Sequence, residues 1–327
     1  MRILFAGTPE PAIPALEKLI EEGHDVVGVL TRTDAKVGRK RVLTPSPVAA
    51  RAEALGLPII KADQLTGEEG HQARDQIDEL QPDLGAVVAY GGLLPQDVLD
   101  MLPKGWVNLH FSLLPAYRGA APVQWAIIQQ EARTGAAVFQ LEAGLDTGPV
   151  YSTLTRELAG DETAGEVLSD LAHQGATLLA TTLTDIQSGN ARAIPQHGDP
   201  SWAPKLTSRD VKIDPAQPAA AVRGLINGTS PAPGAWGMLE SDDTQAARVK
   251  IGRARPVHEP VTTAKQPGEF LLEPNRVLLV CQDGVIELVE VQPAGKKMMH
   301  AKDWARGVDD TIRLQTSRTH PDEFPQH

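Results

Sequence analysis

The chain has 327 residues, which suits two domains and is enough to bury a sizeable core without disulfide bridges. Its formal net charge of −11 excludes a protein that binds nucleic acid through overall basic charge, although a local basic patch could still hold phosphates. The acidity is uneven, because residues 1–208 carry 16 basic and 26 acidic side chains, whereas residues 209–327 carry 15 and 16.

Cysteine content and hydropathy indicate the compartment. The single cysteine, Cys281, excludes an internal disulfide framework and fits a reducing compartment. It lies in the apolar run 277–281, which favours a small core residue over a nucleophile. No apolar run approaches the length that spans a bilayer, and the start MRILFAG is too short for the apolar part of a signal peptide. We therefore expect a cytoplasmic protein that does not bind membranes.

The first thirty residues predict a βαβ unit. Residues 2–6 form a short apolar strand, which the turn at Gly7 ends. A helix follows to about Glu22, and Gly23 suits the position just beyond its end. A second apolar strand covers residues 25–30, so the two strands are expected to be parallel. One face of the helix carries apolar residues at spacings of three and four: Ala12, Ile13, Leu16, Leu19 and Ile20.

The same alternation of strands and helices continues to Gly189. Ser46 and Pro47 predict a helix start, and Gly56 predicts its end. Capping-box spacing at Thr66/Glu69 and Thr163/Glu166 predicts two more helix starts, the second helix reaching Ser188. The other predicted elements are strands 84–89, 105–109, 136–140 and 150–154 and a helix from Pro122. These patterns predict an α/β fold with a doubly wound, Rossmann-like, mostly parallel sheet over residues 1–189.

The remaining residues predict a linker, a small barrel and a tail. Residues 190–208 lack periodicity and contain three prolines, so we interpret them as a linker. Residues 209–313 then predict a β-barrel of OB type, and the polar tail 314–327 is expected to be disordered. Asp283-Gly284 predicts a type I′ hairpin turn. The predicted barrel elements are a helix at 219–226 and strands at 234–240, 246–255, 268–273, 276–281 and 284–292.

The turn after the first strand is the first candidate binding site. A glycine-rich turn at this place often binds phosphate, but Gly7 opens GTPEPA, which lacks the three-glycine spacing of dinucleotide sites. A plain tight turn is therefore the favoured interpretation, and a nicotinamide-dependent oxidoreductase is not expected.

Two polar residues lie near the end of the strand predicted at 105–109, with one residue between them. Asn108 and His110 are two residues apart, so their side chains share a face, and ligands bind beyond such strand ends in doubly wound sheets. The Asn108 amide can donate to a developing oxyanion, and His110 can act as a general acid or base or as a similar donor. Both side chains could equally well serve only to satisfy the end of the strand.

A carboxylate on a glycine-rich loop completes the candidates. Asp146 lies between Gly144 and Gly148 in EAGLDTGP. Such an aspartate is commonly a turn residue, but near Asn108 and His110 it would orient a water or relay a proton. Spacing in the sequence leaves open whether the three side chains meet.

These two segments resemble the formyltransferases that use 10-formyltetrahydrofolate. The family pattern is Asn-x-His-x-Ser-Leu-Leu-Pro, followed later by an aspartate on a Gly-x-Asp-Thr-Gly loop. Phe111 departs from it, because the family more often has a small residue there. The chain matches at Asn108, His110, Ser112, Leu113, Leu114, Pro115, Gly144, Asp146, Thr147 and Gly148.

Other segments resemble one branch of this superfamily, the methionyl-tRNA formyltransferases. They are ILFAGTPEPA, VLTPSPVAARAEALGLP, VVAYGGLLP, RGAAPVQWAI and QPAGKK, and the resemblance runs from Arg2 to about Gly307. It implies transfer of the formyl group of 10-formyltetrahydrofolate to the amino group of methionyl initiator tRNA, for translation initiation. The alternative is another folate-dependent formyltransferase that acts on a small amine.

The resemblance also implies roles for particular residues. The catalytic trio would be Asn108, His110 and Asp146. The folate site would include Tyr90, Gly91, Ser112, Leu113, Leu114 and Pro115. Contacts to tRNA would come from Arg39, Lys40, Arg41, Lys205, Lys296 and Lys297. Arg39 matches a key arginine of a loop that enters the acceptor stem, and Lys205 matches a lysine close to the aminoacyl end. The barrel lysines could equally serve only solubility.

No metal is expected, because no cluster of histidine, cysteine and aspartate has ligand spacing. The expected partners are the tRNA and the folate, and we expect a monomer. A non-catalytic RNA-binding module is a third reading of the chain, but it would leave Asn108, His110 and Asp146 unexplained.

Overall fold

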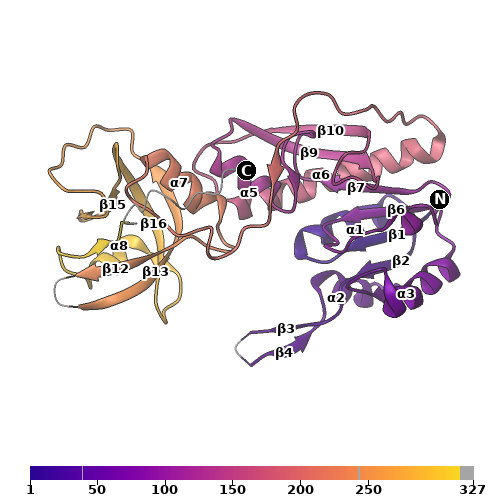
Figure 1. Ribbon diagram of the computed structural model, residues 1–327, viewed down its shortest axis with the longest axis horizontal. Coiled ribbons are helices and arrows are strands. Elements are labelled where there is room, and N and C mark those ends of the chain that lie inside the picture. The colour runs from indigo at the N-terminus through magenta and orange to yellow at the C-terminus, as the bar shows by residue number, and fades with distance from the viewer. Residues whose placement is uncertain (39, 242–243, 317–327) are drawn as a thin grey trace. The chain divides into compact units, whose positions relative to one another are not determined.

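The structure is a computed structural model that describes residues 1–38, 40–241 and 244–316, and its chain divides into two compact units (Figure 1). The first unit comprises Met1–Pro122, Arg133–Glu157 and Val167–Pro204, and the second comprises Val123–Ala132, Leu158–Glu166 and the chain from Lys205 onward. The junction between Pro204 and Lys205 falls inside the segment that we interpret as a linker. The second unit also takes two short segments from within the first 189 residues, which no sequence pattern indicated.

The first unit contains a mostly parallel sheet in the order β10-β9-β7-β6-β1-β2-β5. Its strands are β1 (Arg2–Gly7), β2 (Asp25–Thr31), β5 (Ile59–Lys61), β6 (Leu84–Val88), β7 (Trp106–His110), β9 (Arg133–Gln140) and β10 (Val150–Glu157). The strands from β7 to β5 are parallel, and β9 runs antiparallel to both β7 and β10. The order turns back at β1, which pairs with both β2 and β6. This confirms the Rossmann-like prediction and places the ends of β1, β6 and β7 on one edge.

Helices follow these strands along the chain, and the predicted helix starts agree with the structure. They are η1 (Glu10–Ala12), α1 (Ile13–Glu21), α2 (Pro47–Ala54), α3 (Gly67–Leu80), α4 (Gln96–Leu99), α5 (Pro122–Ile128) and α6 (Ala164–Ser188). Ser46 caps α2 by accepting a hydrogen bond from the Ala49 backbone N–H at 3.0 Å. The capping box of Thr163 and Glu166 forms in both directions. Thr66 is the N-cap of α3, so the predicted helix start is confirmed, but its side chain makes no cap hydrogen bond and the capping box itself does not form.

Short strands lie outside the main sheet of the first unit. β3 (Ala35–Val37) and β4 (Val42–Thr44) form an antiparallel hairpin that stands away from the sheet in Figure 1. β8 (Arg118–Gly119) pairs with β11 (Trp202–Ala203). The second pair ties a segment that we interpret as linker to the chain just after β7.

The buried side chains of the first unit include two large aromatic residues near β6 and β7. Trp106 and Tyr90 are fully buried in one apolar cluster with Leu4, Ile77 and other aliphatic residues. Trp106 also donates from its indole N–H to the Val98 carbonyl at 2.9 Å, so its polar atom is satisfied. Burial of a large side chain stabilises a fold by about 1.5–3 kcal/mol. This core fixes the strand ends from which the candidate residues project.

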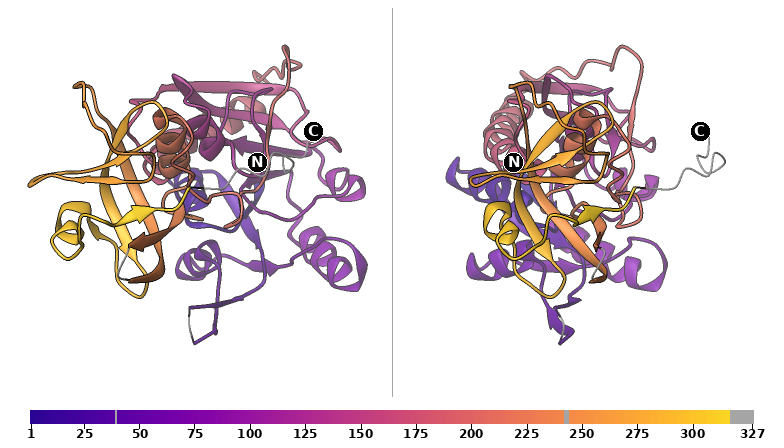
Figure 2. Two further views of the ribbon diagram at one scale, coloured as in Figure 1. Left: turned by 60° about the vertical axis from the view of Figure 1, so that its left-hand side comes forward. Right: turned by 90° about the vertical axis from the view of Figure 1, so that its left-hand side faces the viewer.

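The second unit is an antiparallel sheet whose order is β14-β15-β16-β13-β12-β18, with β17 paired to β16. Its elements are α7 (Ala219–Gly228), β12 (Trp236–Ser241), β13 (Thr244–Pro256), β14 (Phe270–Leu272), β15 (Val277–Val280), β16 (Val285–Pro293), β17 (Met299–His300), α8 (Ala301–Ala305) and β18 (Arg313–Leu314). A bridge between Glu269 and Arg313 joins the two edges, and Figure 2 shows the strands curving toward closure. The predicted OB-like barrel is confirmed as a nearly closed one.

Details of the second unit differ from the sequence prediction. Asp283-Gly284 is not a type I′ turn, because neither residue has a positive φ. Asp283 instead accepts a hydrogen bond from the Ala219 backbone N–H at 2.7 Å. β18 includes Leu314, the first residue of the predicted tail, and residues 317–327 of that tail lie outside the described residues. Cys281 is buried as predicted, at 3% exposure.

No helix that the structure describes has both the length and the apolar character to cross a bilayer.

Candidate active site

Asn108 and His110 project from the end of β7, in the interior of the sheet. β7 pairs with β6 on one side, where Asn108 lies opposite Val87, and with β9 on the other, where His110 lies opposite Ala137. His110 is 7% exposed, and Asn108 is half-buried. The structure therefore holds both side chains on the strand-end edge, as the spacing predicted.

The two ring nitrogens of His110 face different groups. Nε2 lies 2.9 Å from the Tyr117 carbonyl oxygen. Because a carbonyl only accepts hydrogen bonds, Nε2 carries a hydrogen in this contact. Nδ1 faces Asp146, at 3.8 Å from Oδ2. That separation is too long for a hydrogen bond, so in this geometry the two side chains are adjacent but not bonded.

Asp146 is held by the backbone around it. It is 7% exposed, and its Oδ2 accepts a hydrogen bond from the Gly119 N–H at 2.7 Å. Its φ of +52° lies in the left-handed region, which an aspartate adopts more readily than most residues. Gly148 is required, because a Cβ there would lie 1.8 Å from the Gln140 carbonyl oxygen. The structure thus brings His110 and Asp146 together, which sequence spacing could not decide.

Unsatisfied polar atoms remain at this site. Within the described residues, no group donates a hydrogen bond to Oδ1 of Asp146, and none pairs with the Asn108 side-chain amide. One carboxylate oxygen is therefore fixed and the other can accept a proton. The Asn108 amide is similarly free to donate to a ligand atom.

Of the two predicted folate residues that follow β6, Tyr90 is buried and Gly91 is exposed. Tyr90 is 1% exposed, and its hydroxyl donates to the Ala62 carbonyl at 2.7 Å. Burial raises the pKa of Tyr90 to about 12, so its hydroxyl stays protonated. Gly91 is exposed with φ +81°, and its carbonyl accepts a hydrogen bond from Arg32 at 3.2 Å. Gly91, and not the Tyr90 ring, is accessible to a ligand.

The stretch Ser112–Pro115 forms a tight turn after β7. The Ser112 side chain is fully buried and donates to the Ala116 carbonyl at 2.6 Å, so it shapes the turn from inside. Leu113, Leu114 and Pro115 are half-buried, which leaves part of each side chain to contact a ligand. Phe111 is 7% exposed, so its large ring packs inward.

The basic residues predicted to contact tRNA are exposed wherever the structure describes them. Arg39 lies outside the described residues, and the other members of the set are Lys40, Arg41, Lys205, Lys296 and Lys297. The hairpin that carries Lys40 also exposes Val37, Val42 and Leu43, each by more than half. The sequence reading missed these apolar residues, although the alternation in AKV and VLT could have indicated a strand pair.

Sequence reasoning also missed the groups that position the trio. Tyr117 and Gly119 contact His110 and Asp146 through backbone atoms, which carry no residue-type signal. Gln196 and Ser201 come from the segment that we interpreted as linker, and both contact the chain near the trio. The short strand pair of β8 and β11 and the bridge between Val150 and Ile194 hold that segment beside the site.

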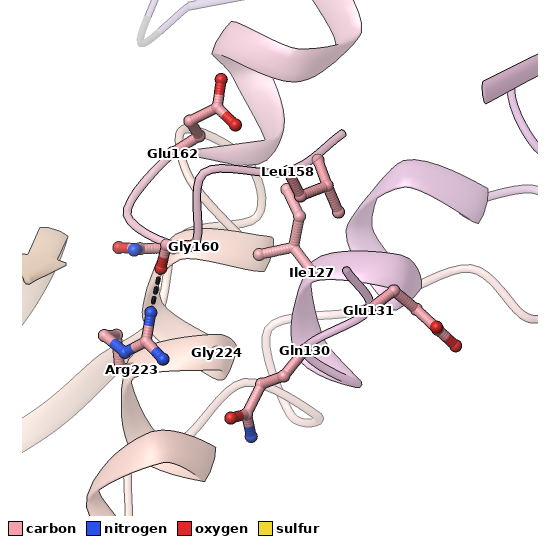
Figure 3. A pocket seen from close by; sticks show the side chains of 9 residues that line it. Ile127, Gln130, Glu131, Leu158, Gly160, Glu162, Arg223 and Gly224 are labelled. Carbon is pink, nitrogen blue, oxygen red and sulfur yellow. Dashed lines mark hydrogen bonds between the residues drawn. The ribbon is translucent and has the colours of Figure 1, made fainter. Parts of the chain in front are cut away.

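A separate pocket lies within the second unit and contains none of the predicted catalytic residues (Figure 3). Its volume is about 170 Å³. Arg223 on α7 lines it and donates a hydrogen bond to the Gly160 carbonyl. Burial lowers the pKa of Arg223. In the described part of the chain, no group of three or more histidine, cysteine, aspartate or glutamate side chains could hold a metal ion.

The comparison with protein families matches both parts of the chain. The family model described as "Formyl transferase" matches residues 1–183, and the one described as "Formyl transferase, C-terminal domain" matches residues 205–309. A methionyl-tRNA formyltransferase from Arthrobacter sp. (strain FB24) is 51% identical over 307 residues, which cover 94% of this chain and 97% of that protein.

Solved structures share the fold. The methionyl-tRNA formyltransferase from Clostridium thermocellum has a TM-score of 0.53 and 15% identity, covering 80% of this chain and 95% of that chain. HypX from Aquifex aeolicus in complex with tetrahydrofolic acid has a TM-score of 0.59 and 18% identity, covering 93% of this chain and 46% of that chain. Because the family models match most of the chain and the Arthrobacter relative shares half of its residues, the chain belongs to the formyl transferase family, among the methionyl-tRNA formyltransferases.

Proposed function

We propose that the protein transfers the formyl group of 10-formyltetrahydrofolate to the amino group of methionyl initiator tRNA. The observation that carries this proposal is the buried pair of His110 and Asp146, at the edge where β6 and β7 end. The 51% identity to a relative of that name supports the choice of acceptor. The setting is translation initiation in the cytoplasm, and the protein acts as a monomer.

The reaction forms one carbon–nitrogen bond and breaks another. The neutral amine of the methionyl group attacks the formyl carbon on N10 of the folate, which gives a tetrahedral intermediate with a negatively charged oxygen. This intermediate collapses with loss of the N10 bond, and N10 takes the proton that leaves the amine. The site must therefore stabilise an oxyanion and move one proton.

Asn108 and His110 stabilise the oxyanion. The free Asn108 amide donates directly, since no described side chain or backbone group competes for it. His110 donates from Nδ1, because Nε2 is bonded to the Tyr117 carbonyl. Nδ1 needs a hydrogen for this role in addition to the one on Nε2, so the ring donates as an imidazolium, whose positive charge lies beside the Asp146 carboxylate, at 3.8 Å from Oδ2.

Asp146 moves the proton. Its Oδ2 is held by the Gly119 N–H, and its Oδ1 is free to accept the proton of the attacking amine. The proton then passes to N10 as the folate leaves. The carboxylate does not need to hold His110 through a hydrogen bond, because the Tyr117 carbonyl already fixes the ring.

The donor binds between the exposed backbone at Gly91 and the turn Ser112–Pro115. Gly91 offers backbone atoms without a side chain in the way, and Leu113, Leu114 and Pro115 offer half-buried apolar surface to the flat pterin ring. Ser112 keeps the shape of the turn. The acceptor stem meets the basic stretch of Arg39, Lys40 and Arg41, while Lys205, Lys296 and Lys297 contact tRNA phosphates.

The test is formyl transfer with the purified protein and 10-formyltetrahydrofolate, offered methionyl initiator tRNA, methionyl elongator tRNA or small primary amines such as an amino-sugar nucleotide. The expected product is formyl-methionyl initiator tRNA. Transfer to a small amine with no transfer to either tRNA would favour the alternative function in its place.

A further inference from the structure

Gln196 comes from a segment that neither family model covers. The matches end at residue 183 and resume at 205, and Gln196 lies in the stretch between them. Its side chain is half-buried rather than exposed, unlike most of its neighbours. A polar side chain that is partly removed from water is expected to make hydrogen bonds to the protein.

The Gln196 side-chain amide uses both its nitrogen and its oxygen in hydrogen bonds to the protein. Nε2 donates to the Asp146 carbonyl and to the Gly148 carbonyl, both at 2.8 Å. Oε1 accepts from Nη2 of Arg118 at 2.6 Å. The orientation of the amide is fixed by these partners, because carbonyls only accept and a guanidinium only donates.

The Asp146 loop requires such a clamp. Asp146 itself has a φ of +52°, a left-handed conformation that aspartate tolerates but that costs more than the ordinary regions, so hydrogen bonds to its backbone help to maintain it. Gln196 holds the carbonyl of this same residue, and the Gly119 N–H holds its carboxylate. Backbone and side chain of Asp146 are therefore fixed from two directions.

The rest of the segment is joined to the same part of the molecule. The Ser201 hydroxyl accepts from the Tyr117 N–H at 2.8 Å, and the Ser201 carbonyl accepts from the Arg118 N–H at 2.8 Å. Tyr117 is the residue whose carbonyl holds His110. The segment thus contacts both the loop of Asp146 and the chain that fixes His110.

We propose that Gln196 is a positioning residue for formyl transfer, which holds Asp146 in the conformation that presents Oδ1 to the attacking amine. This inference rests on the proposed function, since it assumes that Asp146 moves the proton. The Gln196 amide bonds to protein groups at both its nitrogen and its oxygen. Its loss acts through the geometry of Asp146, where misplacement by about 1 Å lowers a rate by about 10²-fold.

The first test is steady-state formylation of methionyl initiator tRNA by the full-length Gln196→Ala protein. We expect kcat to fall by about 10- to 100-fold, with KM for the folate and for the tRNA within about twofold of the wild type. The matched control is Gln174→Ala, an exposed glutamine of α6 that bonds only to Asp170, and it should behave as the wild type. A kcat for Gln196→Ala within twofold of the control would overturn the proposal.

The second test uses Gln196→Glu, which keeps the acceptor for Arg118 but replaces both donors. An ionised glutamate would repel the two carbonyls, whereas a protonated one can donate to one of them. The kcat of this variant, divided by the wild-type kcat at the same pH, should therefore rise as the pH is lowered from 8 toward 5.5. A ratio that does not change with pH would contradict the clamp, and a simple loss of folding would not produce the expected rise.

Asp146→Asn separates this inference from the proposed function. If Asp146→Asn is inactive and Gln196→Ala is fully active, only the inference about Gln196 fails. If Asp146→Asn is fully active, the proposed role of Asp146 in proton transfer is wrong, whatever the activity of Gln196→Ala.

Discussion

Asn108 and His110 lie at the end of β7, where His110 is buried and Asn108 is half-buried. Asn108 and His110 could have been ordinary strand-end residues, and their spacing left that open. The structure adds that His110 is fixed through Nε2 by a backbone carbonyl and that Asn108 has no partner in the described part of the chain. His110 and the Asn108 amide are therefore suited to donate hydrogen bonds to the oxyanion of the intermediate.

Substitution of these two residues tests their role in stabilising the oxyanion. Asn108→Ala and His110→Ala should each lower kcat by about 10²–10³-fold, because each removes one donor to the developing negative charge. The control is His173→Ala, an exposed histidine of α6 whose ring contacts only the Ser169 carbonyl. Formylation kinetics at saturating folate measure the effect, and a loss confined to KM would mean that the residues only bind substrate.

The buried thiol of Cys281 should not react with an alkylating reagent while the protein is folded. Burial raises the pKa of its thiol to about 12, since the thiolate is poorly solvated in the core. Iodoacetamide at pH 8 should therefore leave the folded protein unlabelled and label it rapidly in denaturant, as mass spectrometry would show. Stoichiometric labelling of the folded protein would contradict the buried position.

The same shift predicts a change in stability with pH. The pKa of Cys281 is higher in the folded protein than in the unfolded chain, so its contribution to stability is complete below the ordinary thiol value of 9.0. It is lost as the pH rises from there toward 12. Replacement by alanine should flatten the fall in the free energy of unfolding over this alkaline range.

Secondary-structure elements were predictable where a local signal set them. Ser46 and Pro47 start α2, and Thr163 with Glu166 starts α6, because capping depends only on residues within one turn. Thr66 also precedes a helix at the predicted place, although its side chain makes no cap bond. Asp283-Gly284 failed for a tertiary reason, since the Asp283 carboxylate bonds to the start of α7 instead.

The β3–β4 hairpin is the element that should show the clearest salt dependence. It carries basic residues in a unit that is otherwise acidic, and each lost phosphate contact should flatten the salt slope of binding by about one unit. Arg39→Ala should raise KM for methionyl initiator tRNA and reduce that slope, while KM for the folate stays unchanged. Arg39→Lys should recover only part of the effect, because lysine cannot form a bidentate contact.

Formylation kinetics over a series of salt concentrations measure this effect. Lys104→Ala is the control, since Lys104 is an exposed residue of the same unit outside the hairpin. If Arg39→Ala and Lys104→Ala have the same tRNA kinetics at every salt concentration, the hairpin is only a solvated surface.

At the scale of the whole molecule, the sequence predicted the two folds but not how the chain divides between them. Periodicity and turn residues predicted the parallel sheet and the barrel, because those signals are local. Segments 123–132 and 158–166 belong to the second unit, and no local pattern marks that membership. The contacts of Gln196 and Ser201 were equally hidden, since they join residues far apart in the sequence.

Because the second unit includes segments from within the first 189 residues, a truncated protein would lose more than the barrel. A chain that ends near Gly198 would lose Ser201 and Ala203, whose carbonyls accept hydrogen bonds from Arg118 and Ala121 beside the candidate site. It would also separate segments 123–132 and 158–166 from the rest of their unit. Substitutions in the barrel are therefore a cleaner test of what the second unit contributes.

The barrel should contribute affinity for tRNA and not chemistry. Replacing Lys296 and Lys297 together by alanine should raise KM for methionyl initiator tRNA, because both side chains are exposed and positive, and should leave kcat within about twofold. Lys302→Ala, another exposed lysine of the second unit, serves as the control. A fall in kcat at saturating tRNA would show that the barrel takes part in the chemical step.

The central claim is that Asp146 moves the proton during formyl transfer to methionyl initiator tRNA. Single-turnover transfer from 10-formyltetrahydrofolate, compared between the wild type and Asp146→Asn, tests it most directly. Asparagine can keep the hydrogen bond from Gly119 but cannot accept the proton, and Asp185→Asn, an exposed carboxylate, is the control. We predict rapid transfer by the wild type and the control, and transfer slower by at least about 10²-fold for Asp146→Asn with folate binding intact. Transfer by Asp146→Asn at the wild-type rate, or no transfer by the wild type, would contradict the account.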